Sequence, residues 1–388
     1  MTAINQLSRF ARPMNGRDSD ESHRAATPLE LLFDLVSVIA IAAAAAGLHH
    51  AIADDHAIIG IIKFSCAFFA IWWAWMNYTW FASAYDNDDS LFRILTMVIM
   101  AGALAMAAGV DAFFESRDLR LIIAGYVIMR IGMVCLWLRA ARHDPAHRTT
   151  ALIYAVGISL VQLFWISFAV SSLDGNTFYG LFLIGIALEL SVPVIAERKN
   201  TTSWHRHHII ERYGLLNIIV LGETLLAGSM ALEHALGESV EWELVRIALY
   251  SLVILFSMWW LYFSREDHLE NQSLSRALVW GYGHILVFGA GAAVGAGVAV
   301  LVDIATDHAQ VSEPVGLFAV AVPAAMYLIG LWLIRDRFVL SGYGKHLLLG
   351  FAILMMVTPL LPFALEALAG LMVLAVIARS RLARTNQL

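Results

Sequence analysis

The stretch from Ala26 to Leu48 reads ATPLELLFDLVSVIAIAAAAAGL, and it becomes almost wholly apolar after its first few residues. Thr27 can cap a helix whose first turn holds a proline, and Glu30 follows three residues after the cap, which is the pattern of a capping box. About 20 apolar residues suffice for a helix to cross the hydrocarbon core of a bilayer. The stretch therefore predicts a transmembrane helix with two acids, Glu30 and Asp34, one turn apart near its start.

Similar apolar runs recur along the whole chain of 388 residues, of which 60% are hydrophobic and only 14% charged. A soluble protein carries nearly twice that share of charged residues. The sequence therefore predicts an all-α polytopic membrane protein with about twelve transmembrane helices. The expected spans are Leu29–Leu48, Ala57–Trp80, Leu91–Phe113, Leu119–Leu138, Ala151–Leu173, Phe178–Ala196, Ile209–Leu232, Leu244–Phe263, Leu274–Val302, Val315–Ile334, Leu347–Leu361 and Phe363–Ala378.

Lysine and arginine are distributed unevenly between the expected loops. With a cytoplasmic N-terminus, the outer loops carry only Arg117, Arg120 and Arg246 of the 25 Lys and Arg residues, and most of the others fall in inner segments. The positive-inside rule then predicts that both termini are cytoplasmic and that the number of spans is even. No cleavable signal peptide is expected, because no small-residue cleavage site separates the first apolar run from the rest.

Four pairs of segments echo each other at offsets of about 181 to 195 residues and in the same order. DDSLFRIL resembles NQSLSRAL, WWAWMNY resembles WWLYFS, CLWLRAAR resembles GLWLIRDR, and Glu30 opens the first span as Glu211 opens the seventh. This pattern predicts two parallel six-helix repeats. The expected divisions are a cytoplasmic N-terminal arm (1–28), a first repeat (29–200) and a second repeat (201–388). Chance agreement between Trp- and Leu-rich helices is the alternative.

Several of these motifs also identify a family. The segments PLELLFDLV, WWAWMNYTWF, YDNDD, FRILTM, ERYGLLNIIVLGETLLA and WWLYF resemble the bacterial low temperature requirement A (LtrA) family over nearly the whole chain. The resemblance implies a multi-span protein of the bacterial inner membrane, in a family named for a cold-growth phenotype. It implies no substrate.

Five of the ionisable residues in the expected spans are candidates for a shared interior group, because a charge costs about 2.5 to 3.5 kcal/mol at the helix centre. They are Asp34, Arg130, Glu189, Glu223 and His284. Glu223 lies about 18 Å along its helix from the inner end, near the bilayer midplane. Because hydrocarbon disfavours lone charges, we expect these residues to meet in the interior as a substrate or proton pathway. A buried Arg–carboxylate pair that only fixes helix packing is the alternative.

Two further groups are candidates for function. Asp86, Asp88 and Asp89, followed by Arg93, form an expected cytoplasmic latch between the second and third spans, by analogy with loops of secondary transporters. His207, His208 and Glu211 are candidates for a metal site, because His207 and Glu211 share a helix face. A solvated histidine cluster at the membrane surface is the alternative, and whether a metal binds stays open.

The function that best fits these features is a proton- or ion-coupled secondary transporter in the bacterial inner membrane, more in keeping with a non-enzyme than with an enzyme. No ATP-binding loop, dinucleotide fingerprint or zinc motif occurs in the sequence, and no cofactor is expected. The expected partners are the lipid bilayer and a small solute or ion, without nucleic acid. Two alternatives remain: a non-catalytic membrane factor that supports growth in the cold, and a membrane enzyme with a carboxylate and histidine metal site.

Overall fold

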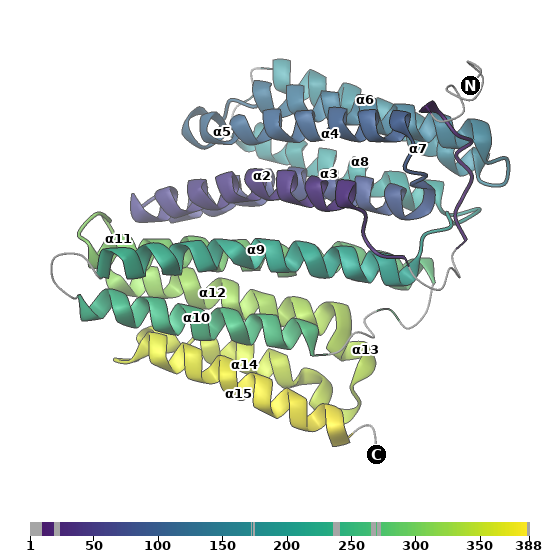
Figure 1. Cartoon of the computed structure of the whole chain (residues 1–388). Coiled ribbons are helices and arrows are strands. Elements are labelled where there is room, and N and C mark those ends of the chain that lie inside the picture. Colours follow the sequence, from purple (N-terminus) through teal and green to yellow (C-terminus); the bar gives the residue numbers. More distant parts are fainter. Residues whose placement is uncertain are drawn as a thin grey trace. The chain divides into compact units, whose positions relative to one another are not determined.

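The computed structural model describes residues 10–18, 24–171, 173, 175–235, 241–264, 269 and 273–385, without the side chains of residues 223, 234–235 and 383–385. All regular secondary structure in this part of the chain is helical (Figure 1). The chain divides into two compact units, and two of its helices pass from one unit to the other near their middle.

The first unit comprises Met1–Ala40 and Phe69–Arg212. Within it α4 packs against α6, α6 against α7, and α7 against α8. The helices that lie in it wholly or in part are α2 (Pro28–Ala53), α3 (Ala57–Tyr85), α4 (Ser90–Ala108), α5 (Val110–Ser116), α6 (Arg120–His143), α7 (Arg148–Val170), α8 (Gly175–Ala196) and α9 (Arg206–Ala235).

The second unit comprises Ile41–Phe68 and Tyr213–Leu388. Within it α11 packs against α12, α12 against α14, and α14 against α15, while α10 packs against α15 and α11. It contains the second half of α2, the start of α3 and most of α9. The other helices of this unit are α10 (Trp242–Phe263), α11 (Leu274–Ala305), α12 (Glu313–Leu331), the π-helical turn η1 (Trp332–Asp336), α13 (Arg337–Val339), the short 3₁₀ turns η2 (Gly342–His346) and η3 (Thr358–Leu360), α14 (Leu347–Met355) and α15 (Ala364–Thr385).

Eleven helical segments of the described chain are long and apolar enough to cross a membrane. They confirm the prediction of a polytopic helical membrane protein. The eleventh predicted span corresponds to the candidate span Gly342–Leu360, in which α14 ends at Met355 and a 3₁₀ turn containing Pro359 follows. The twelfth predicted span lies in α15 and is not among the eleven, since Glu366 and Arg379 leave only a short uncharged stretch between them.

Close helix contacts in each unit depend on small residues. A Cβ atom added to Gly102 of α4 would lie 2.5 Å from the carbonyl oxygen of Gly125 in α6, and one added to Gly125 would lie 2.5 Å from that of Gly102. A Cβ atom on Gly297 of α11 would lie 2.2 Å from the carbonyl oxygen of Ala319 in α12. Small residues allow such backbones to approach, which is how helices associate inside a bilayer.

Candidate functional site

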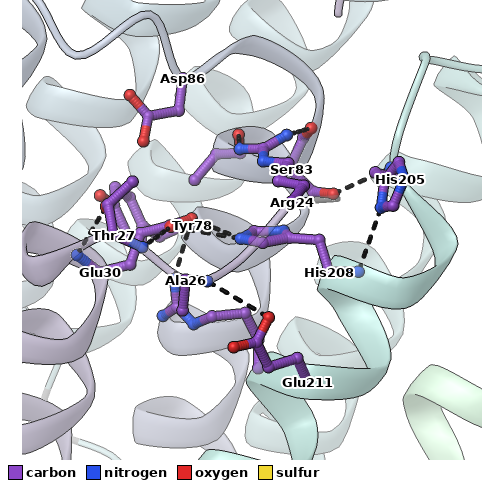
Figure 2. Close-up of polar contacts among 12 residues, drawn as sticks. Arg24, Ala26, Thr27, Glu30, Tyr78, Ser83, Asp86, His205, His208 and Glu211 are labelled. Atoms are coloured by element: carbon purple, nitrogen blue, oxygen red, sulfur yellow. Dashed lines mark hydrogen bonds and ion pairs between the residues drawn. The ribbon is translucent and has the colours of Figure 1, made fainter. Parts of the chain in front are cut away.

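The capping box predicted at the start of α2 is present. The backbone N–H of Thr27 donates to Glu30 Oε2 at 2.8 Å, and the backbone N–H of Glu30 donates to Thr27 Oγ1 at 3.3 Å (Figure 2). These bonds satisfy two N–H groups at the helix start, where backbone donors otherwise lack partners. They also fix the carboxylate of Glu30, whose side chain is fully buried.

Arg212 of α9 lies between the two acids of α2. Its Nη1 is 3.0 Å from Glu30 Oε1, and its Nη2 donates to Asp34 Oδ1 at 2.5 Å. Trp75 of α3 donates its indole N–H to the same Asp34 oxygen at 2.7 Å. All three charged side chains are fully buried, so a single guanidinium balances two carboxylates in an environment of low polarity.

His208 of α9 completes this group, which we call the α2–α9 cluster: Glu30, Asp34, His208 and Arg212. Its Nε2 lies 3.1 Å from Glu30 Oε1, and the ring is fully buried. Nearby, Arg24 donates to the backbone carbonyls of Ser83 and, at 2.6 Å, Ala82 (Figure 2). The side chain of Arg24 therefore ties the N-terminal arm to the end of α3.

The candidate metal residues of α9 point in different directions. His208 is buried against Glu30, whereas His207 and Glu211 are exposed. Glu211 instead accepts a hydrogen bond from the backbone N–H of Ala26 at 3.2 Å (Figure 2). No group of three or more His, Cys, Asp or Glu side chains among the described residues is arranged to hold a metal ion.

A second buried group, which we call the Glu189 cluster, joins four helices of the first unit. The Oε1 atom of Glu189 in α8 accepts from the Tyr126 hydroxyl at 2.7 Å and the Trp165 indole at 3.1 Å. Its Oε2 atom accepts from the Trp73 indole at 2.8 Å and from Arg130 at 3.0 Å. Of the five predicted pathway residues, the structure thus brings Arg130 and Glu189 together, with each carboxylate oxygen satisfied by two donors.

Of the other predicted pathway residues, Asp34 belongs to the α2–α9 cluster. His284 of α11 belongs to the second unit, where its Nδ1 lies 2.7 Å from the carbonyl oxygen of Trp280 and its Nε2 lies 3.1 Å from the Tyr262 hydroxyl. The carbonyl contact requires Nδ1 to carry the hydrogen, so Nε2 of the neutral ring accepts from the tyrosine. Glu223 lies in α9, but its side chain is outside the described residues.

Three of the four predicted latch residues form two arrangements, and the fourth, Asp86, accepts from the backbone N–H of Asp88 at 2.8 Å. Arg93 makes a two-point ion pair with Asp88, with N–O distances of 2.8 and 2.7 Å, and both side chains are half exposed. Asp89 caps α4 by accepting from the backbone N–H of Phe92 at 2.8 Å, and it also accepts from Arg139 of α6 at 3.0 Å. The first arrangement lies at the surface, and the second ties the loop to α6.

The aspartates of this loop differ in their pKa values for clear physical reasons. Burial, reinforced by the negative charge of Glu30, raises the pKa of Asp86 to about 6. Burial also disfavours ionisation of Asp89, but the hydrogen bonds from Arg139, Phe92 and Arg12, together with the charge of Arg139, outweigh it and lower the pKa of Asp89. The hydrogen bonds from Arg93 lower the pKa of Asp88. Asp86 therefore changes charge nearest to neutral pH among these three.

The second unit contains a buried ion pair group that the sequence analysis did not predict. Asp336 accepts from Arg335 at 2.7 Å and from Arg379 of α15 at 3.0 Å. Arg335 also donates to the carbonyl of Leu261 at 2.7 Å.

A separate cavity of about 360 Å³ in the same unit is lined almost wholly by apolar side chains such as Phe64, Phe68 and Phe318. It suits an apolar group.

The sequence analysis missed the basic members of the α2–α9 cluster. Arg212 contributes there only to the positive charge that sets the orientation of the helices, and His208 is considered only as a candidate metal ligand. One signal pointed to Arg212. It lies near the start of the predicted seventh span, as Asp34 lies near the start of the predicted first span, and both starts are expected on the inner side of the membrane. An arginine and an aspartate at matched depths in two spans form a candidate pair. The tryptophan and tyrosine donors to Glu189 carry no comparable signal.

Comparisons with known proteins agree with the motifs in these sites. The model of the bacterial low temperature requirement A protein (LtrA) family matches residues 25–380. An uncharacterized protein of Rhizobium meliloti (strain 1021) is 27% identical over 293 residues, covering 70% of this chain and 68% of that protein. No solved structure matches the chain. Because the family model covers nearly all the described helices, including both acids of α2 and Arg212 of α9, this multi-pass membrane protein belongs to the bacterial LtrA family.

Proposed function

We propose that this chain is a proton- or ion-coupled secondary transporter of the bacterial inner membrane. The observation that carries the proposal is the α2–α9 cluster, in which Glu30 and Asp34 share the single guanidinium of Arg212 inside apolar helices. Buried ionisable residues in spanning helices are costly, and they mark ion and proton paths in membrane proteins. The proposed path also includes the Glu189 cluster, Glu223 and His284.

The proposed topology has twelve spans, with α15 as the twelfth and both termini in the cytoplasm. The distribution of Lys and Arg between the loops supports it, because the outer loops would carry only three of these residues. An even number of spans keeps both termini on one side. The same bias supports insertion in the bacterial inner membrane.

The proposed pair of six-helix repeats is supported by the order of helix neighbours. The sequence α4, α6, α7 and α8 in one unit matches α11, α12, α14 and α15 in the other, each helix packing on the next. Among the described residues, the first pair of each series contains its unit's closest contact between a glycine and the backbone of a neighbouring helix, at Gly102 with Gly125 and at Gly297. Similar bundles that rock against each other are a common design in secondary transporters.

The loop between α3 and α4 serves as the latch in this proposal. The ion pair between Asp88 and Arg93 is at the surface, where a charged pair is worth about 1 kcal/mol or less and can open readily. The pair of Asp89 with Arg139 is buried, so it holds the loop on α6 more firmly. The latch then opens at its exposed half first.

A second candidate function, a non-catalytic membrane factor, is favoured by the Glu189 cluster. Four donors satisfy the two oxygens of Glu189, which suits a fixed link between helices rather than a moving proton. The factor proposal expects Glu189→Gln and Glu223→Gln to restore growth in the cold to a strain that lacks the protein. The transporter proposal expects both variants to fail while still reaching the membrane at normal levels.

A flux assay tests the transporter proposal directly. The purified protein is reconstituted into liposomes that contain a pH-sensitive dye, and solutes of different charge are added across an imposed pH gradient. We expect at least one solute to change the internal pH with the wild type, and the change to be lost in Asp34→Asn. Asp118→Asn, in a loop between spans, is the matched control and should retain it. Wild-type liposomes that behave as empty ones across the whole panel would contradict transport.

A further inference from the structure

We propose that Asp34 binds an exchangeable proton on its Oδ2 atom, so that the coupling ion of the proposed transporter is a proton held at the α2–α9 cluster. Only the statement that this proton is the coupling ion rests on the proposed function. The proton site itself follows from charge balance, hydrogen bonding and burial at the cluster, and it is tested without measuring flux.

The charge balance of the cluster calls for one proton. Glu30 and Asp34 each carry a negative charge when ionised, and Arg212 supplies one positive charge. Beside the cluster, the positive charge of Arg24 offsets the negative charge that Asp86 carries when it is ionised. With a neutral His208, the cluster retains an excess of one negative charge. A buried site tolerates an uncompensated charge poorly, and binding a proton neutralises it.

The hydrogen bonds identify the atom that takes the proton. Glu30 Oε2 accepts from the Thr27 amide at 2.8 Å. Glu30 Oε1 has no hydrogen-bond partner among the described residues, but it forms ion-pair contacts with Arg212 at 3.0 Å and with His208 at 3.1 Å, which disfavour a proton there. Asp34 Oδ1 accepts from Trp75 and Arg212, whereas Asp34 Oδ2 is buried with no hydrogen-bond partner among the described residues. A proton on Oδ2 leaves every hydrogen bond of the cluster intact.

His208 is the competing base, and its surroundings disfavour the proton there. Its Nε2 faces Glu30, so this nitrogen carries the hydrogen of the neutral ring. Its Nδ1 is buried and has no hydrogen-bond partner among the residues described. An imidazolium would place a second N–H at that position without an acceptor, which costs about 1 to 3 kcal/mol. The neutral imidazole leaves only a lone pair there.

The other groups around Asp34 are consistent with this assignment. The segments around the cluster also bring Tyr78 of α3, Asp86 just after α3, Arg24 of the arm, His205 just before α9, and Glu211 of α9 (Figure 2). Tyr78 is uncharged at neutral pH, and Glu211 is exposed to solvent. The proton comes from hydronium, which gives its proton to the carboxylate and leaves water, and the reverse step returns it.

Infrared difference spectroscopy on reconstituted full-length protein tests the site. Protein labelled with ¹³C at the aspartate carboxyl carbons is titrated between about pH 5 and about pH 9, the range that separates ordinary carboxyl groups from tyrosines. We expect a carboxylic-acid carbonyl band that shifts with the label and disappears as the pH rises. The label assigns the band to aspartate in the wild type, so the test does not depend on a variant folding.

Three variants then locate the band. Asp86→Asn removes the part of the signal that belongs to Asp86. Asp34→Asn removes the remaining titrating band directly. Glu30→Gln also removes it, because Asp34 and Arg212 then form a neutral pair that needs no proton. Asp118→Asn is the control in an exposed loop and retains it.

The outcomes separate the proton site from the transport proposal. The outcomes are read in the Asp86→Asn background, where the signal of Asp86 is absent. A labelled band that titrates there and vanishes when Asp34→Asn or Glu30→Gln is added supports the site, even in a protein that moves no solute. The site is overturned if no labelled band remains in Asp86→Asn, if that band never titrates, or if it survives the addition of Asp34→Asn. A band that survives Glu30→Gln overturns the charge-balance argument. Sodium-dependent changes without a titrating band would assign the site to a metal cation instead.

Discussion

The guanidinium of Arg212 holds the carboxylate of Asp34 with an N–O distance of 2.5 Å, although the two residues are 178 positions apart in the chain. One comes from the segment ERYG and the other from the segment LLFD, which are the motifs that identified the family in the sequence. Their contact gives both motifs a physical role. Each supplies the charge that the other needs in order to be buried.

Removing the charge of Arg212 should be costly. Arg212→Gln leaves two buried carboxylates without a counter-charge, and breaking a buried ion pair from one side costs about 3 to 5 kcal/mol. Thermal unfolding in detergent should show a large fall in stability. Arg93→Gln, in a half-exposed pair, is the matched control and should cost less than about 1 kcal/mol. Equal losses in the two variants would contradict the assigned burial.

The Glu189 cluster should show strong coupling between its members. Glu189→Gln leaves Arg130 buried without a counter-charge, and we expect a loss of about 3 to 5 kcal/mol. The double variant Glu189→Gln, Arg130→Gln should lose less than the sum of the two single variants, because neither charge is then left alone. Unfolding measurements on all four proteins complete the cycle. Simple additivity would mean that the pair does not form.

The capping box at the start of α2 should contribute a moderate amount. Thr27→Ala removes the side-chain acceptor for the Glu30 amide, and loss of such a cap costs about 0.5 to 2 kcal/mol. Thr27→Ser keeps the hydroxyl and should stay within a few tenths of the wild type. The comparison of the two unfolding midpoints checks the role of the hydroxyl. A serine variant as unstable as the alanine variant would point to the methyl group.

Asp86 should make stability depend on pH. Its pKa of about 6 in the folded protein is above the ordinary value of 3.8, so the folded state binds the proton more tightly than the unfolded state. Its contribution therefore favours folding below about pH 4 and is lost as the pH rises through about 6. Two pKa units correspond to about 3 kcal/mol, the upper limit for this effect. Unfolding at about pH 5 and about pH 7.5 should show the loss in the wild type and a flatter profile in Asp86→Asn.

The contact of α4 with α6 should not accept a larger residue. Gly102→Ala places a methyl group against backbone atoms of α6, and overpacking of this kind costs about 1 to 3 kcal/mol. Gly180→Ala in α8 is the matched control, because a Cβ atom there meets nothing within 4 Å. It should be neutral or slightly stabilising, since alanine favours helix more than glycine does. A tolerated Gly102→Ala would contradict the close packing of these helices.

The sequence by itself determined the class of fold. A continuous apolar run of spanning length forms a helix in a bilayer, because a helix satisfies each backbone N–H and C=O group within its own segment. The capping box was also readable, since its two partners, Thr27 and Glu30, are three residues apart. The last span was harder to predict, because Pro359 and Glu366 interrupt the apolar pattern on either side of the turn.

Only the tertiary structure decided which charges meet. Asp34 was predicted to need a partner, but its partner depends on how α9 packs against α2 within the first unit. In the same way, the satisfaction of Glu189 by two tryptophans and a tyrosine depends on four helices packing together. A buried charge needs a partner, and the local hydropathy of the sequence predicts which charges are buried. The choice of partner is made by helix packing over long sequence separations, which local patterns do not encode.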